Sequence, residues 1–100
     1  MDRTMIIALI EMRRTFSREV SDVLSLISSS GSLNELNQNV SRAMGILTCF
    51  ADMVDTLNKV TGYSILEASM DAARAEYRRA LDEVNAAQVA WMDKNAPWNK

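Results

Sequence analysis

The apolar residues between positions 33 and 57 recur at alternating steps of three and four residues. The members of this stripe are Leu33, Leu36, Val40, Ala43, Leu47, Phe50, Val54 and Leu57. On an α-helix this spacing gathers the side chains into one apolar stripe, as at the seam of a coiled coil. The opposite side of such a helix carries mainly polar residues, among them Gln38, Arg42 and Asp52. We therefore predict a helix over residues 33–61 that packs against other helices through the stripe.

Two further stretches have a related pattern. The first predicts a helix over about residues 2–28, and its apolar positions are Met5, Leu9, Met12, Phe16, Val20, Val23 and Ile27. The last predicts a helix over about residues 65–94, and its apolar positions are Leu66, Met70, Ala73, Tyr77, Ala80, Val84, Ala87 and Trp91. All three helices are therefore expected to meet through coiled-coil-like seams.

Turn and capping residues separate the three stretches. Residues 28–31 read Ser-Ser-Ser-Gly, which ends a helix because serine competes for backbone hydrogen bonds and glycine readily adopts the left-handed cap. Ser32 and Glu35 have the spacing of a capping box, in which each side chain bonds the backbone amide of the other residue. Gly62 is expected to end the middle helix, and residues 64–67 repeat the capping spacing.

These elements predict the all-α fold class, with the three helices in an up-down-up antiparallel bundle. The connections are so short that consecutive helices have to lie antiparallel. The 100 residues are expected to form one domain, in which residues 95–100 are a short C-terminal tail. An alternative layout is a helical hairpin whose first helix swings away to pair with another chain. In either layout we expect an oligomeric or partner-bound protein.

Composition narrows the possible class of function. Hydrophobic residues make up 48% of the chain, while one proline and three glycines argue against a many-stranded β fold. The net charge of −2 is too small to indicate nucleic acid as the partner. Cys49 is the single cysteine, which excludes an internal disulfide framework and is typical of a reducing compartment. We therefore expect a cytoplasmic protein, or a component of an assembly made in the cytosol.

The chain contains no histidine. This excludes Ser-His and Cys-His pairs, His-ligated zinc and the imidazole as a general base. Neighbouring carboxylates such as Asp52 and Asp55 fall on outward or flanking positions, whereas acid–base catalysis needs a buried carboxylate. We expect a non-enzymatic protein without catalytic residues, a cofactor or a metal site.

Apolar residues outside the stripes indicate a binding surface for a partner. Ile6, Ile7 and Ile10 point away from the seam of the first helix, and such a patch is unusual for a soluble monomer. Met44 and Met53 flank the stripe of the middle helix. One interpretation is that the last helix and the tail with Trp98 fold over the isoleucines. We favour a second interpretation, in which the partner-binding residues are Ile6, Ile7, Ile10, Met44, Met53 and Trp98.

The sequence thus favours an interaction or assembly module that binds itself or a larger protein. Examples of this class are an inhibitor, a chaperone and a component of a virion or secretion assembly. One alternative is a peripheral binder of membrane surfaces, whose first helix would place Arg3, Arg13 and Arg14 on lipid headgroups. Another alternative is a bundle that binds a small ligand. The residues expected near such a pocket are Tyr77, Cys49 and Trp91.

Overall fold

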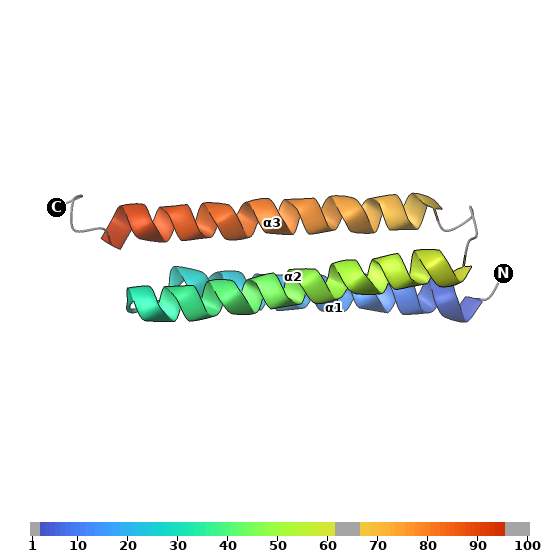
Figure 1. Cartoon of the computed structure of the whole chain (residues 1–100), viewed down its shortest axis with the longest axis horizontal. Helices are drawn as coiled ribbons and strands as arrows, with labels where there is room; N and C mark the ends of the chain where they lie inside the picture. The colour runs from blue at the N-terminus through green and yellow to red at the C-terminus, as the bar shows by residue number, and fades with distance from the viewer. Residues whose placement is uncertain (1–2, 62–66, 96–100) are drawn as a thin grey trace.

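Three long helices lie side by side in the computed structural model (Figure 1). They are α1 (Arg3–Ser28), α2 (Leu33–Thr61) and α3 (Glu67–Asn95). The structure describes the backbone of residues 3–61 and 67–95, and the side chains of residues 6–57, 59 and 71–95. Within these ranges there is no strand, and each helix packs against the other two. The predicted all-α class and three-helix packing are therefore confirmed.

The helix bounds agree closely with the hydrophobic pattern. The predicted bounds at 28, 33 and 61 are confirmed, and α3 ends at residue 95 rather than 94. The predicted helix starts at 2 and 65, together with the turn at Gly62, fall outside the described residues. Each helix has 26 or 29 residues, which corresponds to a length of about 40 Å. Because the lengths are similar, each helix has neighbours along most of its length.

Contacts at two levels of α1 show that α1 and α2 run in opposite directions. Asn39 donates a hydrogen bond to the backbone carbonyl of Leu26 at 3.1 Å. Further from the connecting turn, Phe50 stacks on Phe16, with ring centroids 3.9 Å apart and 11° between the ring planes. Later residues of α2 therefore lie beside earlier residues of α1, as the colours in Figure 1 also show.

Two other contacts show that α3 runs in the same direction as α1. Glu76 accepts hydrogen bonds from Arg13 of α1. The indole of Trp91, further along α3, donates to the backbone carbonyl of Ser30, just after the end of α1. Because both contacts join distant parts of the sequence, they fix the register of α3 against the hairpin of α1 and α2.

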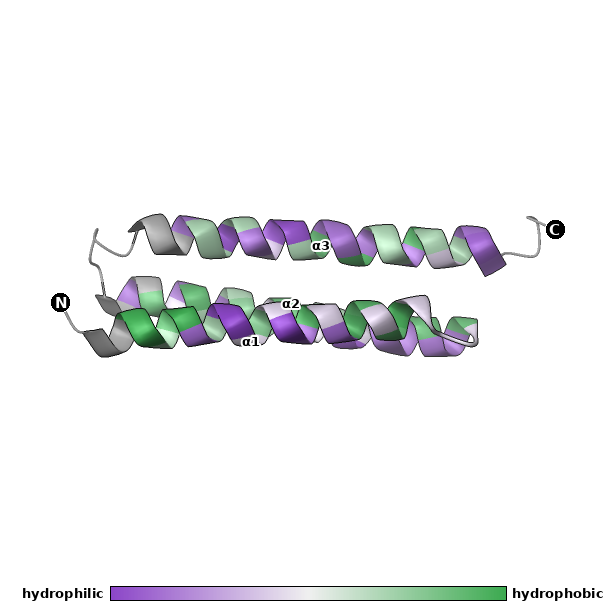
Figure 2. Ribbon diagram, turned by 180° about the vertical axis from the view of Figure 1, so that it is seen from behind, coloured by the Kyte–Doolittle hydropathy of each residue, from purple (hydrophilic) through white to green (hydrophobic). Residues whose placement is uncertain are grey.

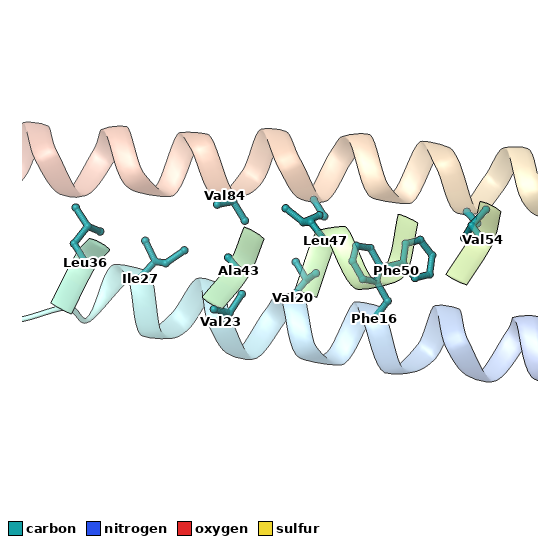
Figure 3. Close-up of a cluster of buried hydrophobic side chains, with 12 residues drawn as sticks. Phe16, Val20, Val23, Ile27, Leu36, Ala43, Leu47, Phe50, Val54 and Val84 are labelled. Carbon is teal, nitrogen blue, oxygen red and sulfur yellow. The ribbon is translucent and has the colours of Figure 1, made fainter. Parts of the chain in front are cut away.

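The core lies between the three helices and consists almost wholly of the predicted seam residues (Figure 3). Its buried members are Leu9, Phe16, Val20, Val23, Ile27, Leu36, Ala43, Leu47, Phe50, Val54, Ala73, Ala80 and Val84. Most of the large side chains come from α1 and α2, whereas residues 71–95 of α3 contribute two alanines and one valine to the buried set. Leu33 is an exception to the predicted seam because it is 53% exposed. It is the first residue of α2 and lies at the end of the bundle, where fewer neighbours surround it.

The predicted capping box at the start of α2 is half confirmed. The backbone amide of Glu35 donates to Ser32 Oγ at 3.1 Å, as expected for an N-cap. The predicted second bond, from the Ser32 amide to the Glu35 side chain, is wrong. Glu35 Oε2 accepts from the amide of Gly31 at 2.7 Å instead. Gly31 lies between α1 and α2, and its backbone amide has no partner within either helix. The Glu35 carboxylate therefore reaches back four residues to accept from this amide.

Candidate functional site

The first turns of α1 carry three exposed isoleucines, which we call the isoleucine patch. Ile6 is 37% exposed, Ile7 58% and Ile10 42%. Figure 2 shows these turns as the strongly hydrophobic start of α1. The described part of α3 therefore leaves the isoleucines partly exposed, while the side chains of the first turn of α3 lie outside the described residues. The other predicted cover, the tail with Trp98, lies outside the described residues, and so does the predicted binding role of Trp98.

Helix geometry explains why the patch is not part of the core. Ile10 and Ile6 lie three and seven residues before Arg13 and so share its side of α1. Arg13 extends to α3, while Leu9 points into the core and is buried. Ile7 lies further round the helix toward solvent. The patch therefore borders the α1–α3 side at one end of the bundle, where α3 leaves it partly open.

Next to the patch, an ion pair between Arg13 and Glu76 joins α1 to α3. Arg13 Nη2 donates to Glu76 Oε1 at 2.6 Å, and Arg13 Nε donates to both carboxylate oxygens at 3.1 and 3.2 Å. These hydrogen bonds raise the pKa of Arg13, partial burial lowers it, and the charge of Glu76 raises it further. Arg13 therefore stays cationic at every physiological pH, with its charge directed at Glu76.

Met44 and Met53 lie on opposite flanks of α2, and each is 39% exposed. Met53 lines a groove between α1 and α2 together with Met12 and Cys49. Met44 precedes Ala51 by seven residues and so shares its flank, which faces α3. Methionine side chains adapt to irregular surfaces, so both residues are suited to contact a partner.

The outward face of α2 lies between these two methionines. An open groove along this face is lined by Gly45, Cys49 and Asp52, among others. A Cβ atom at Gly45 would meet no atom within 4 Å, so no described part of the chain packs on this glycine. Cys49 is exposed, and its thiol donates to the sulfur of Met53 at 3.8 Å.

The structure does not bring the predicted binding residues into one cluster. The isoleucine patch borders the α1–α3 side of the bundle, whereas Met44 and Met53 flank the outward face of α2. On α1, Met12 faces the groove with α2, and Ile10 lies on the other side of the same helix. The bundle therefore carries two separate candidate surfaces, one on α1 and one on α2.

The predicted ligand pocket is wrong, because its three residues lie apart. Tyr77 lines a groove between α2 and α3 that includes Ala51. Cys49 lies on the outward face of α2. Trp91 is fourteen residues beyond Tyr77 on α3, which corresponds to about 21 Å along the helix. The three residues therefore cannot line one small-molecule site.

A polar cluster that the sequence did not predict joins all three helices at the other end of the bundle. Trp91 Nε1 donates to the carbonyl of Ser30 at 2.8 Å. Asn39 Nδ2 donates to Ser30 Oγ at 2.9 Å and to the carbonyl of Leu26 at 3.1 Å. Ser30 Oγ in turn donates to the carbonyl of Leu26 at 3.0 Å. Two signals in the sequence point to such a cluster: a tryptophan on a seam needs a partner for its N–H, and a helix end offers carbonyls.

The described residues give no indication of a metal site or a membrane span. Among them, no three or more Cys, Asp or Glu side chains come together in a group that could hold a metal ion. No helix in ranges 3–61 and 67–95 has the length and apolar character needed to cross a bilayer. No protein-family model, curated protein or solved structure matches this chain.

Proposed function

We propose that this chain is a non-enzymatic interaction module, an up-down-up antiparallel three-helix bundle that binds another protein in the cytosol. The observation that supports this proposal is the isoleucine patch, whose three side chains are 37–58% exposed beside a closed core. Contiguous apolar surface of this kind marks binding sites in soluble proteins. Met44 and Met53 provide a second, smaller apolar contribution on α2.

The driving force would be burial of the exposed isoleucine side chains. Apolar area removed from water stabilises a complex by about 25 cal/mol per Å². The patch lies on a helix that Leu9 and Phe16 already hold in the core. A partner would therefore meet a preformed surface, which lowers the entropic cost of binding.

The membrane-surface alternative receives less support from the geometry. It needs free cationic side chains beside the apolar patch. Arg13 is bonded to Glu76, and Arg14 Nη1 lies 3.3 Å from Glu11 Oε1. These carboxylates offset the charges that lipid headgroups would otherwise attract. We therefore treat binding to anionic vesicles as an outcome that the experiment has to separate from binding to protein.

The test removes the patch and compares it with an equal loss of apolar surface elsewhere. The patch variant combines Ile6→Ser, Ile7→Asn and Ile10→Gln. The matched control combines changes at exposed apolar residues outside the patch: Leu26→Gln, Leu33→Ser and Val89→Asn. Wild type and both variants are examined by light scattering, by affinity purification from the native source and by flotation with anionic vesicles.

We expect the patch variant to lose co-purifying protein or measured self-association, and the control variant to keep it. Retention of both properties by the patch variant would contradict the proposal. Flotation of the wild type that is lost in the patch variant, without any protein companion, would favour the membrane-surface alternative instead.

A further inference from the structure

The outward face of α2 carries a second regular stripe, which we call the outer stripe. Its residues are Glu35, Gln38, Arg42, Gly45, Cys49, Asp52, Thr56 and Lys59, and all of them are exposed. They are three and four residues apart, because they share the face of α2 opposite the buried seam. This spacing places all eight residues on one face of α2, where they could meet a second helix along about 36 Å.

The outer stripe has a symmetry that a second copy of α2 can use. Two copies of α2 can pack antiparallel about a two-fold axis that crosses the outer face between Gly45 and Cys49, at the level of residue 47. In that arrangement the position numbers of opposed residues add up to 94. This register follows from the positions alone, so the informative point is which residue types it opposes. The pairs are Glu35 with Lys59, Arg42 with Asp52, Gln38 with Thr56, and Gly45 with Cys49. Both charged pairs join opposite charges, and the two-fold axis forms each pair twice.

We propose that the outer stripes of two copies of this chain pack against each other in this antiparallel register. The proposal rests on the proposed function, because it names a second copy of the chain as one partner of the module. Arg42 and Asp52 form no ion pair among the described residues, although Arg42 lines a groove with Glu19 and Asp22 of α1. Both residues are exposed, so a second copy can approach their charges from solvent. Glu35 also accepts from the Gly31 amide, which leaves the central Arg42–Asp52 pair as the main determinant of register.

Gly45 supports close approach at the centre of this pairing. A glycine in the middle of an exposed helix face disfavours the helix relative to alanine. The surrounding chain gives no reason for it, since a Cβ atom there would touch nothing within 4 Å. Opposite Cys49 of a second copy, the missing side chain lets two backbones approach closely. Met53 lies at the edge of the stripe and would contribute apolar area to the same contact.

Charge reversal tests the register directly. Arg42→Asp places two aspartates opposite each other twice in the dimer, and Asp52→Arg does the same with two arginines. We expect each single variant to raise the dissociation constant at least about tenfold, because attraction becomes repulsion at two symmetric sites. The double variant restores opposite charges and is expected to return to within about threefold of wild type. Asp82→Arg, an exposed reversal on α3, is the matched control and should leave association unchanged.

A cross-link tests the same register by a different measurement. Gly45→Cys places a thiol opposite Cys49 of the second copy, so mild oxidation should give a covalent dimer on a non-reducing gel. The two thiols of one chain cannot bond to each other, since Cβ atoms four residues apart on a helix are about 5–6 Å apart and a disulfide needs about 3.5–4.5 Å. Ser25→Cys on the exposed side of α1 is the control and should give little covalent dimer.

Light scattering over a dilution series, with circular dichroism to verify the fold, decides between the outcomes. Recovery of dimer mass in the double charge variant supports the proposal. A monomeric wild type, or single and double variants that associate equally, would overturn it. If the isoleucine-patch variant loses association while all outer-stripe variants keep it, the proposed function stands and this inference fails. If the outer-stripe variants alone lose association, the inference stands and the role of the isoleucine patch fails.

Discussion

At the end of the bundle where α1 turns into α2, Trp91, Ser30 and Asn39 join all three helices by hydrogen bonds. At the opposite end, Ile6 and Ile7 on the first turns of α1 remain exposed. Both ends carry large apolar side chains, but only at the first do the described contacts enclose one within a polar cluster.

The difference separates residues that hold the fold from residues that are available for binding. A buried or half-buried polar cluster is stabilising when all of its donors and acceptors are paired, and it specifies one arrangement of the helices. Exposed apolar side chains contribute little to the stability of the isolated chain. The comparison therefore predicts large effects on unfolding at the closed end and small effects at the isoleucine patch.

The largest effect is expected for Trp91→Ala. The change removes a half-buried aromatic side chain and leaves the Ser30 carbonyl without its indole donor. We expect the free energy of unfolding to fall by about 3 kcal/mol, at the lower end of the range for such truncations. Urea denaturation measures the change. Trp91→Phe keeps most of the apolar surface and should cost only about 1 kcal/mol, the value of one hydrogen bond. Equal losses in the two variants would contradict the role of the indole N–H.

An intermediate effect is expected for Asn39→Asp. The substitution preserves shape but replaces an amide donor by a carboxylate, which faces the Leu26 carbonyl and Ser30 Oγ. We expect a loss of about 1–2 kcal/mol at neutral pH, because the donor is lost and oxygen atoms are brought together. Thermal or urea unfolding measures the loss. Asn37→Asp, on an exposed position of the same helix, is the control and should have little effect.

The smallest effect on stability is expected for single polar substitutions in the isoleucine patch. Ile7→Asn should change the free energy of unfolding by no more than about 0.5 kcal/mol, because the side chain is already 58% exposed. Leu9→Asn, two residues further on, is the contrasting variant, since Leu9 is buried and a polar group there has no partner. If Ile7→Asn destabilised the chain as much as Leu9→Asn, the isoleucine would have to be counted as part of the core.

Much of the fold could be predicted because helix formation and seam packing depend on local spacing. The alternation of three and four residues identified α2 and most of its buried side, including Leu36, Leu47 and Phe50. The exposure of Ile6, Ile7 and Ile10 also followed from helix geometry, since these residues lie off the seam. Leu33 was assigned wrongly because periodicity places a residue on a face but does not show where the neighbouring helices end.

The amino-acid sequence by itself determined where the helices lie and which side of each is apolar, because both depend on residues within a few turns of one another. Tertiary structure alone decided which side chains meet across helices. The Arg13–Glu76 pair joins residues 63 positions apart, and the bond from Trp91 to Ser30 joins residues 61 positions apart. The hydrophobic periodicity does not show which residues so far apart in the sequence will meet, because the register between helices depends on the packing of all three at once.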